Sequence, residues 1–165
     1  MQALIVIESW FGNTHTIGAQ IADGLERGGV ATTLYSVADA PTVIPESVGL
    51  VVIGAPTHNR GLSTPVTRSK AAAMANNTNA PETGVREWIP TLSISVGTQV
   101  AIFDTVTGKT WLSGSAAKVA AKLIGKSHPD APVSIQSFVV KGTQGPLAPG
   151  ETSAAHAWGE ALSQS

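Results

Sequence analysis

Three separated runs of apolar residues constrain the fold of this chain more than any other feature. They occupy residues 3–7, 50–53 and 100–103 and are rich in Val and Ile. Short, uninterrupted apolar runs of this kind are typical of parallel strands that are covered on both faces. The sequence therefore predicts a parallel sheet in the middle of the molecule, with helices on each side of it.

Helical and extended patterns alternate around these runs. Ile17, Ile21 and Leu25 recur at helical spacing, for example, between the first two runs. The pattern predicts helices over residues 13–25, 114–124 and 151–162, further strands over 32–37 and 132–140, and a loop over 76–84. The alternation predicts one α/β domain over residues 1–165. We expect a three-layer α/β/α sandwich with a five-stranded parallel sheet in the order 2-1-3-4-5.

Composition excludes several classes of function. The chain has 165 residues, of which 42% are hydrophobic, and ten Lys and Arg against eleven Asp and Glu give a formal net charge of -1. Without a basic field or a basic run, we expect no nucleic-acid partner. No apolar run approaches the roughly 20 residues that cross a bilayer, so we expect no membrane partner and a cytoplasmic location. The chain has no cysteine, so redox chemistry would require a bound cofactor.

The loop after the first predicted strand favours an anion. In an open parallel sheet, ligands bind at the carboxyl ends of the strands, where the strand order reverses. Residues 8–14 leave the first strand there and lead directly into a helix, so backbone N–H groups and the hydroxyls of Ser9 and Thr14 point at one concavity. Gly12 allows a close backbone approach, and Asn13 tolerates unusual dihedral angles. An ordinary capped helix start is the alternative interpretation.

The sequence also narrows the kind of anion. It contains neither the Gly-rich dinucleotide fingerprint nor a Gly-x-x-x-x-Gly-Lys-Ser/Thr loop. A terminal monophosphate held by neutral donors remains. Two more loops should meet this one, over residues 54–61 and 104–111, because they follow the second and third apolar runs. His58 could protonate or hydrogen-bond a ligand, with a solvated side chain as the alternative. The other three histidines lack metal-ligand spacing, so no metal is assigned.

At these positions the chain resembles the flavodoxin-like family. Its phosphate loop, Ser/Thr-x-Ser/Thr-Gly-Asn-Thr, is similar to residues 9–14, Ser-Trp-Phe-Gly-Asn-Thr. Gly-Ala-Pro-Thr-His at 54–58 and Phe-Asp-Thr at 103–105 resemble the two loops that flank the flavin ring, and later segments are similar to a bacterial branch of the family. The resemblance implies non-covalent binding of FMN, with its phosphate in the first loop and its isoalloxazine ring between the other two.

The resemblance also implies which residues contact FMN. Those at the phosphate are Ser9, Gly12, Asn13 and Thr14, with Trp10 and Phe11 contributing backbone N–H groups, and those at the ring are Pro56, Thr57, His58, Asp104 and Thr105. Phe11 stands where the family usually has a hydroxyl residue. The only tyrosine, Tyr35, lies on the second predicted strand, away from the crevice. Trp10, His58 or Trp111 would therefore have to cover the ring.

Several functions are compatible with such a site. The first is electron transfer through bound FMN, with a redox partner protein such as a reductase or a small electron acceptor. Alternatives are a small NAD(P)H- or quinone-dependent flavin oxidoreductase and a degenerate domain that no longer binds FMN. A phosphate-receiving signalling domain is disfavoured, because the first strand ends in a single carboxylate, Glu8, and only Lys141 fits the remaining pattern. No residue is assigned a catalytic role.

Overall fold

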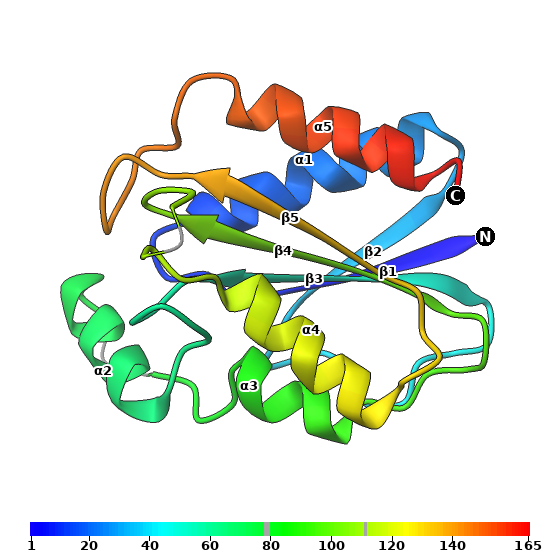
Figure 1. Cartoon of the computed structure of the whole chain (residues 1–165), viewed down its shortest axis with the longest axis horizontal. Coiled ribbons are helices and arrows are strands. Elements are labelled where there is room, and N and C mark those ends of the chain that lie inside the picture. Colours follow the sequence, from blue (N-terminus) through cyan, green and yellow to red (C-terminus); the bar gives the residue numbers. More distant parts are fainter. Residues whose placement is uncertain (78–79, 111) are drawn as a thin grey trace.

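The computed structural model describes residues 1–77, 80–110 and 112–165. Five strands and the helices between them follow one another along the chain (Figure 1). The strands are β1 (Gln2–Ile7), β2 (Ala31–Ser36), β3 (Val48–Pro56), β4 (Gln99–Val106) and β5 (Val133–Val139). The helices are α1 (Asn13–Arg27), α2 (Pro65–Met74), α3 (Val85–Trp88), the 3-10 helix η1 (Ile89–Thr91), α4 (Ala116–Ser127) and α5 (Glu151–Leu162).

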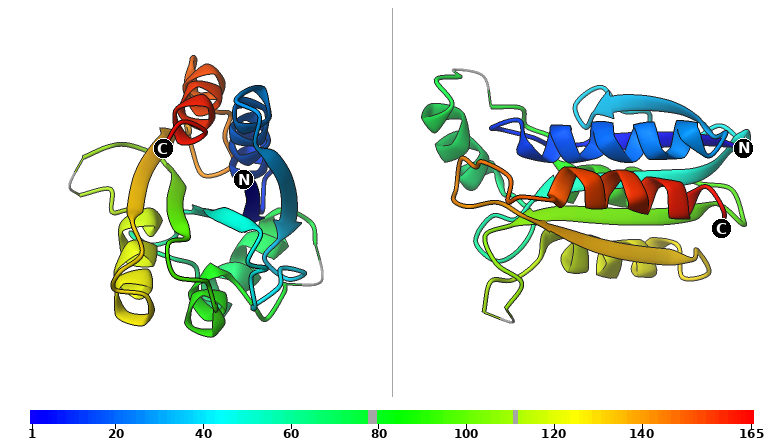
Figure 2. Two further views of the ribbon diagram at one scale, coloured as in Figure 1. Left: turned by 90° about the vertical axis from the view of Figure 1, so that its right-hand side faces the viewer. Right: turned by 90° about the horizontal axis from the view of Figure 1, so that it is seen from above.

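The five strands form one parallel sheet in the order β2-β1-β3-β4-β5. Helices α1 and α5 cover one face, and α3 and α4 cover the other (Figures 1 and 2). The predicted fold class and strand order are confirmed. β1 has β2 on one side and β3 on the other, so the strand order reverses at β1, and the carboxyl ends of all five strands meet at one edge.

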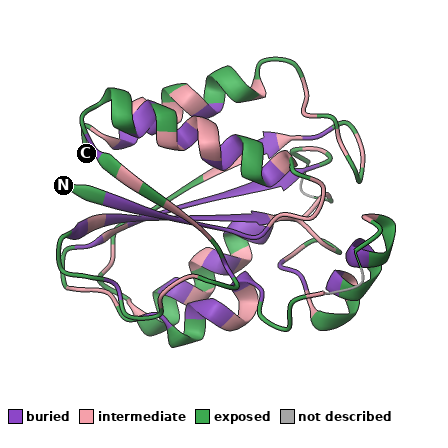
Figure 3. Ribbon diagram, turned by 180° about the vertical axis from the view of Figure 1, so that it is seen from behind, coloured by how far each residue is buried: buried purple, intermediate pink, exposed green. Residues whose placement is uncertain are grey.

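Each face of the sheet carries its own apolar core (Figure 3). The central strands are buried on both faces, as their uninterrupted apolar runs predict. Under α1 and α5, Phe103 and Phe138 pack edge to face with ring centroids 6.0 Å apart. The two helices touch through glycines: a Cβ built on Gly24 would lie 2.1 Å from the carbonyl oxygen of His156. This close contact holds α1, and therefore its amino-terminal end, against the sheet.

The fold differs from the sequence prediction between β3 and β4. In the described connection from β2 to β3, which contains no helix, the apolar residues Val37 and Ile44 pack with Trp88 and Ile89. Helices α2 and α3 were not predicted. The reason is physical: α3 has only four residues, too few for a period, and α2 consists largely of small and polar residues. None of the helices in the described ranges is long and apolar enough to cross a membrane.

Candidate functional site

A pocket of about 310 Å³ opens at the carboxyl edge of the sheet. It lies within the size range of small-molecule and cofactor sites. Its walls come from the loop after β1, the loop after β3, helix α2, the end of β4 and the segment after β5. Most of the residues that the sequence singles out line it together: Ser9, Trp10, Phe11, Asn13, Thr14, Pro56, Thr57, His58 and Thr105. Gly12 and Asp104 do not line it.

The loop after β1 leads into helix α1, whose first backbone N–H groups have no capping side chain. Gly12 is the N-cap of α1 and has a left-handed backbone (φ 88°), which glycine adopts without strain. No side chain caps the helix. Within the described ranges, no group accepts a hydrogen bond from the backbone N–H of Gly12, Asn13 or Thr14, whereas the His15 N–H donates to Ser9 Oγ at 3.3 Å. The first turn of α1 thus presents unpaired donors at the positive end of its dipole.

Side chains of this loop tie it to its neighbours. Asn13 Nδ2 donates to the carbonyl oxygen of Gln144 at 3.0 Å, which links the loop to the segment after β5. The hydroxyls of Thr14 and Thr105 lie 2.9 Å apart and are both buried, which links it to the end of β4. The Asn13 amide group is therefore occupied by the protein, and its backbone N–H is the part left free.

Asp104 has a structural position instead of lining the pocket. Its carboxylate is fully buried, and its Oδ2 accepts hydrogen bonds from Ser115 Oγ at 2.6 Å and from the Ala117 N–H at 3.0 Å. The Thr57 hydroxyl donates to the same oxygen at 3.2 Å and accepts from the Ala116 N–H at 3.0 Å. Asp104 therefore holds the start of α4 and, through it, the hydroxyl of Thr57 beside the pocket.

The loop after β3 closes in a tight turn that fixes His58. The backbone groups of His58 and Gly61 exchange two hydrogen bonds, and the residues between them, Asn59 and Arg60, have positive φ angles of 45° and 69°. The His58 side chain is half-buried beside the pocket. Burial lowers the pKa of its imidazole, the carboxylate of Glu8 opposes this shift, and Arg68 lowers the pKa further. The ring is therefore neutral at pH 7, since an unperturbed histidine has a pKa near 6.5.

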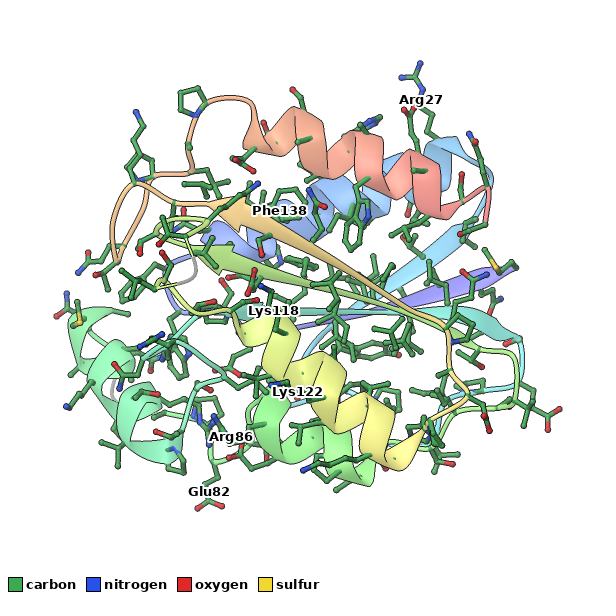
Figure 4. The ribbon with its side chains drawn as sticks, in the orientation of Figure 1. Arg27, Glu82, Arg86, Lys118, Lys122 and Phe138 are labelled. Carbon is green, nitrogen blue, oxygen red and sulfur yellow. The ribbon has the colours of Figure 1, made fainter. Side chains whose placement is uncertain are left out.

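Sequence reasoning missed a cluster of buried charges behind His58. Arg68 has no exposed side-chain surface, and it donates to Ser63 Oγ at 3.0 Å and to the carbonyl of Glu82 at 2.7 Å while pairing with Glu87 at 3.0 Å. Glu8 is 4% exposed and accepts from the Val85 N–H at 2.9 Å. Figure 4 shows Glu82 and Arg86 in this part of the molecule, between α2 and α3.

The same cluster holds Trp10. Its indole N–H donates to Glu8 Oε1 at 3.3 Å, and the ring lines the pocket, as does the ring of Phe11. Trp10 therefore lines the pocket while its indole is held by Glu8, whereas the sequence predicted only that it could cover a ligand ring. Trp111, the other candidate tryptophan, lies outside the described residues. Among the described residues, no three His, Asp or Glu side chains gather so that they could hold a metal ion.

Helix α2 forms a wall that was not predicted either. Thr67, Lys70, Ala71 and Met74 face the pocket from it. A signal for this helix exists in the sequence: Thr64 precedes Pro65, and the structure shows Thr64 as the N-cap, its hydroxyl accepting from the Thr67 N–H at 3.3 Å. Threonine at the N-cap followed by proline at the first helical position is a typical helix start.

Comparison with known proteins adds to this geometry. No protein-family model and no curated protein matches the sequence, but solved structures match the fold. A flavodoxin from the domain Archaea has a TM-score of 0.63 at 16% identity, covering 99% of this chain and 97% of that one. Oxidised flavodoxin 1 from Bacillus cereus has a TM-score of 0.63 at 13% identity, covering 96% and 95%. This chain has the flavodoxin-like fold.

A larger protein contains the same fold as one part. Rubredoxin:oxygen oxidoreductase from Desulfovibrio gigas matches with a TM-score of 0.63 at 16% identity, covering 99% of this chain but only 35% of that one. At these identities the comparisons establish the flavodoxin-like architecture. The ligand has to be argued from the residues of the site.

The residues of this flavodoxin-like fold fit a flavin mononucleotide. The open N–H groups of the α1 start suit a phosphate, and no protein atom lies within 4 Å of a Cβ built on Gly12, so the backbone there can be approached closely. No carboxylate lines the pocket in the described part of the chain. Trp10, Phe11 and Pro56 give apolar surface for a planar ring.

Proposed function

We propose that this protein binds FMN without a covalent bond and takes part in electron transfer. The observation that supports the proposal is the start of α1, where unpaired N–H groups beside a left-handed Gly12 are available to an anion at the reversal of the strand order. The flavodoxin-like fold supports it, since flavodoxins are among the matching structures. Bound FMN would supply chemistry that this chain's side chains lack, the reversible uptake of one or two electrons.

Neutral donors suffice to hold the phosphate in this proposal. The backbone N–H groups of Gly12, Asn13 and Thr14 would donate to its oxygens, aided by the Ser9 hydroxyl and by the N–H groups of Trp10 and Phe11. The α1 dipole stabilises a negative charge at this end without a basic side chain. Phe11 replaces a hydroxyl here, so one donor fewer is present, which costs about 1 kcal/mol of binding free energy.

The ring of FMN would lie against the loops that follow β3 and β4. Pro56, Thr57, His58 and Thr105 line the pocket there, and Asp104 would act indirectly by holding the Thr57 hydroxyl. Neutral His58 can donate one hydrogen bond and accept another. Its loop turn and the tether of Trp10 to Glu8 keep both side chains in place before the ligand arrives.

The partner is either a redox protein such as a reductase or a small electron acceptor. The formal net charge of -1 gives little long-range attraction toward a charged protein partner. One observation favours the second candidate function, a small NAD(P)H- or quinone-dependent oxidoreductase: helix α2, which supplies none of the proposed flavin contacts, also lines the pocket. Steady oxidation of NAD(P)H by the purified protein alone would distinguish this enzyme from an electron carrier, which requires a reductase.

The decisive experiment for the proposal compares FMN with riboflavin, which lacks the phosphate. We expect FMN to bind at least about tenfold more tightly in a fluorescence titration, because each charge-assisted hydrogen bond contributes about 1.5–3 kcal/mol. Gly12→Ala should lower the affinity for FMN and leave the affinity for riboflavin unchanged. Gly29→Ala is the matched control, since Gly29 also has a left-handed backbone (φ 83°) with no atom within 4 Å of a built Cβ, at the far end of α1. Equal affinity for both ligands would refute the phosphate site.

A further inference from the structure

Helix α2 is placed unlike the other helices. It lies beyond the carboxyl ends of the strands instead of covering a face of the sheet (Figures 1 and 2). One side of it nevertheless faces the protein's pocket: Thr67, Lys70, Ala71 and Met74 line the cavity, at spacings of three, four and seven residues. Such residues lie on one face of a helix. The outer wall of the pocket is therefore a single helical stripe.

The stripe combines a charge with apolar surface. Lys70 and Met74 are exposed, with Met74 at 48%, whereas Ala71 is buried beneath them. Lys70 has no ion-pair partner among the described residues. Among the described lining residues, the other side chain that can carry a positive charge is His58, and burial lowers the pKa of its imidazole, so it is neutral at pH 7. The described lining thus carries one permanent positive charge and no negative charge.

The proposed FMN contacts do not use this stripe. They come from the start of α1 and from the ends of β3 and β4, whereas α2 begins nine residues after Pro56. Trp10 and Phe11 line the same cavity, so its described lining combines aromatic residues with the thioether of Met74 and the ammonium group of Lys70. A flat apolar molecule with one anionic substituent could contact the apolar lining and pair with the ammonium group of Lys70.

We propose that the α2 stripe is a second binding site in the pocket, and that it takes a small aromatic anion such as an aromatic carboxylate. Lys70 pairs with the anionic group, and Met74 and Ala71 contact the ring. This inference rests on the proposed function, because it assigns to FMN the rest of the cavity. It makes Lys70 a residue that selects the ligand by charge.

The test uses two naphthalene probes of nearly equal shape, one anionic and one neutral. 2-Naphthoate carries a carboxylate, and 2-naphthalenemethanol is neutral. FMN-loaded protein is titrated calorimetrically with each, and we expect the carboxylate to bind about fivefold more tightly, as an exposed ion pair allows. Lys70→Gln should abolish the preference. Lys122→Gln should leave this preference unchanged, because Lys122 is an exposed lysine on α4 that does not line the pocket (Figure 4).

The outcomes separate this inference from the proposed function. Equal affinity for the two probes, or a preference that survives Lys70→Gln, overturns the second site and leaves FMN binding intact. If Lys70→Gln instead removes the preference of the protein for FMN over riboflavin, then Lys70 pairs with the phosphate, and the second site is again overturned. Failure of FMN to bind at all is seen in the first titration, before a probe is added, and overturns both proposals.

Discussion

The loop after β1 and the cluster of buried charges behind His58 differ in whether their polar groups have hydrogen-bond partners. In the loop, backbone N–H groups at the start of α1 have no acceptor within the described ranges. Behind His58, the buried side chains of Glu8 and Arg68 are held by Val85, Ser63, Glu82 and Glu87, and only the Nε atom of Arg68 lacks a partner. The difference indicates that the buried charged side chains behind His58 stabilise the fold, whereas the unpaired donors at the start of α1 are backbone groups.

The first way to break this comparison is to remove the buried cation. Arg68→Met should lower the free energy of unfolding by about 3–5 kcal/mol, since it leaves Glu87, the buried Ser63 hydroxyl and the Glu82 carbonyl without their partner. Urea denaturation measures the change. Arg27→Met removes an exposed ion pair, that with Glu160, and should cost no more than about 1 kcal/mol. Similar losses for the two variants would show that the buried cluster is not structural.

A second test adds volume to the same cluster. A Cβ on Gly84 would lie 2.5 Å from Arg68 Nη1 and 2.7 Å from Glu8 Oε2, so Gly84→Ala should lower the stability by about 1–3 kcal/mol. Gly125→Ala is its control, in helix α4 with no atom within 4 Å of the built Cβ. This second variant should gain up to about 1 kcal/mol from better helix propensity. Equal changes in both would contradict the close packing at Gly84.

A third test addresses the loop itself. Thr14→Ala removes the hydroxyl that pairs with Thr105 and should cost about 1–2 kcal/mol, both in stability and in FMN affinity, by leaving a buried hydroxyl unpaired and loosening the start of α1. Riboflavin affinity should hardly change. Thr14→Ser keeps the hydroxyl and should restore most of both quantities, measured by denaturation and by fluorescence titration. A Thr14→Ser variant as defective as Thr14→Ala would implicate the methyl group instead.

The smallest expected effect concerns His58, where the two regions meet. Because burial lowers its pKa, the unfolded chain binds a proton at His58 before the folded one does as the pH falls below about 6.5. The loss of stability caused by His58 therefore builds up as the pH falls from about 6.5 to its folded pKa and persists at lower pH, and His58→Gln should remove this part of the acid sensitivity. An NMR titration of the imidazole should give a midpoint below 6.5. A midpoint at or above that value would contradict the burial of the ring.

Much of the fold could be predicted because its strands must be apolar on both faces. The runs at 50–53 and 100–103 lie inside β3 and β4, and the helices α1, α4 and α5 have clear periods. Helix α2 could not be found by period, since its ten residues are mostly small or polar and contain no regular spacing of large apolar residues. Helix α3 could not be found either, because its four residues are too few for a period, although Trp88 and Ile89 belong to the same core cluster as Val37 and Ile44.

The meeting of the loops at one pocket was predictable for the same topological reason, because loops at the carboxyl ends of neighbouring strands have to meet. Matching by motif placed Asp104 among the ring contacts, but its hydrogen bonds to Ser115 and Ala117 depend on where α4 begins, which the sequence alone does not determine. Arg68 and Glu8 were overlooked as structural residues because charged side chains are usually exposed. Their burial becomes evident only when Gly84 and Val85 are placed between them.

The most direct measurement of the central claim follows the backbone N–H groups of Gly12, Asn13 and Thr14 in a nitrogen-15 NMR spectrum during titration with FMN and, separately, with riboflavin. If these groups hold the phosphate, their proton resonances move strongly downfield with FMN and change little with riboflavin, while the amides of β5 serve as an internal reference. Identical shifts with the two ligands, or no shift with FMN, would contradict the account.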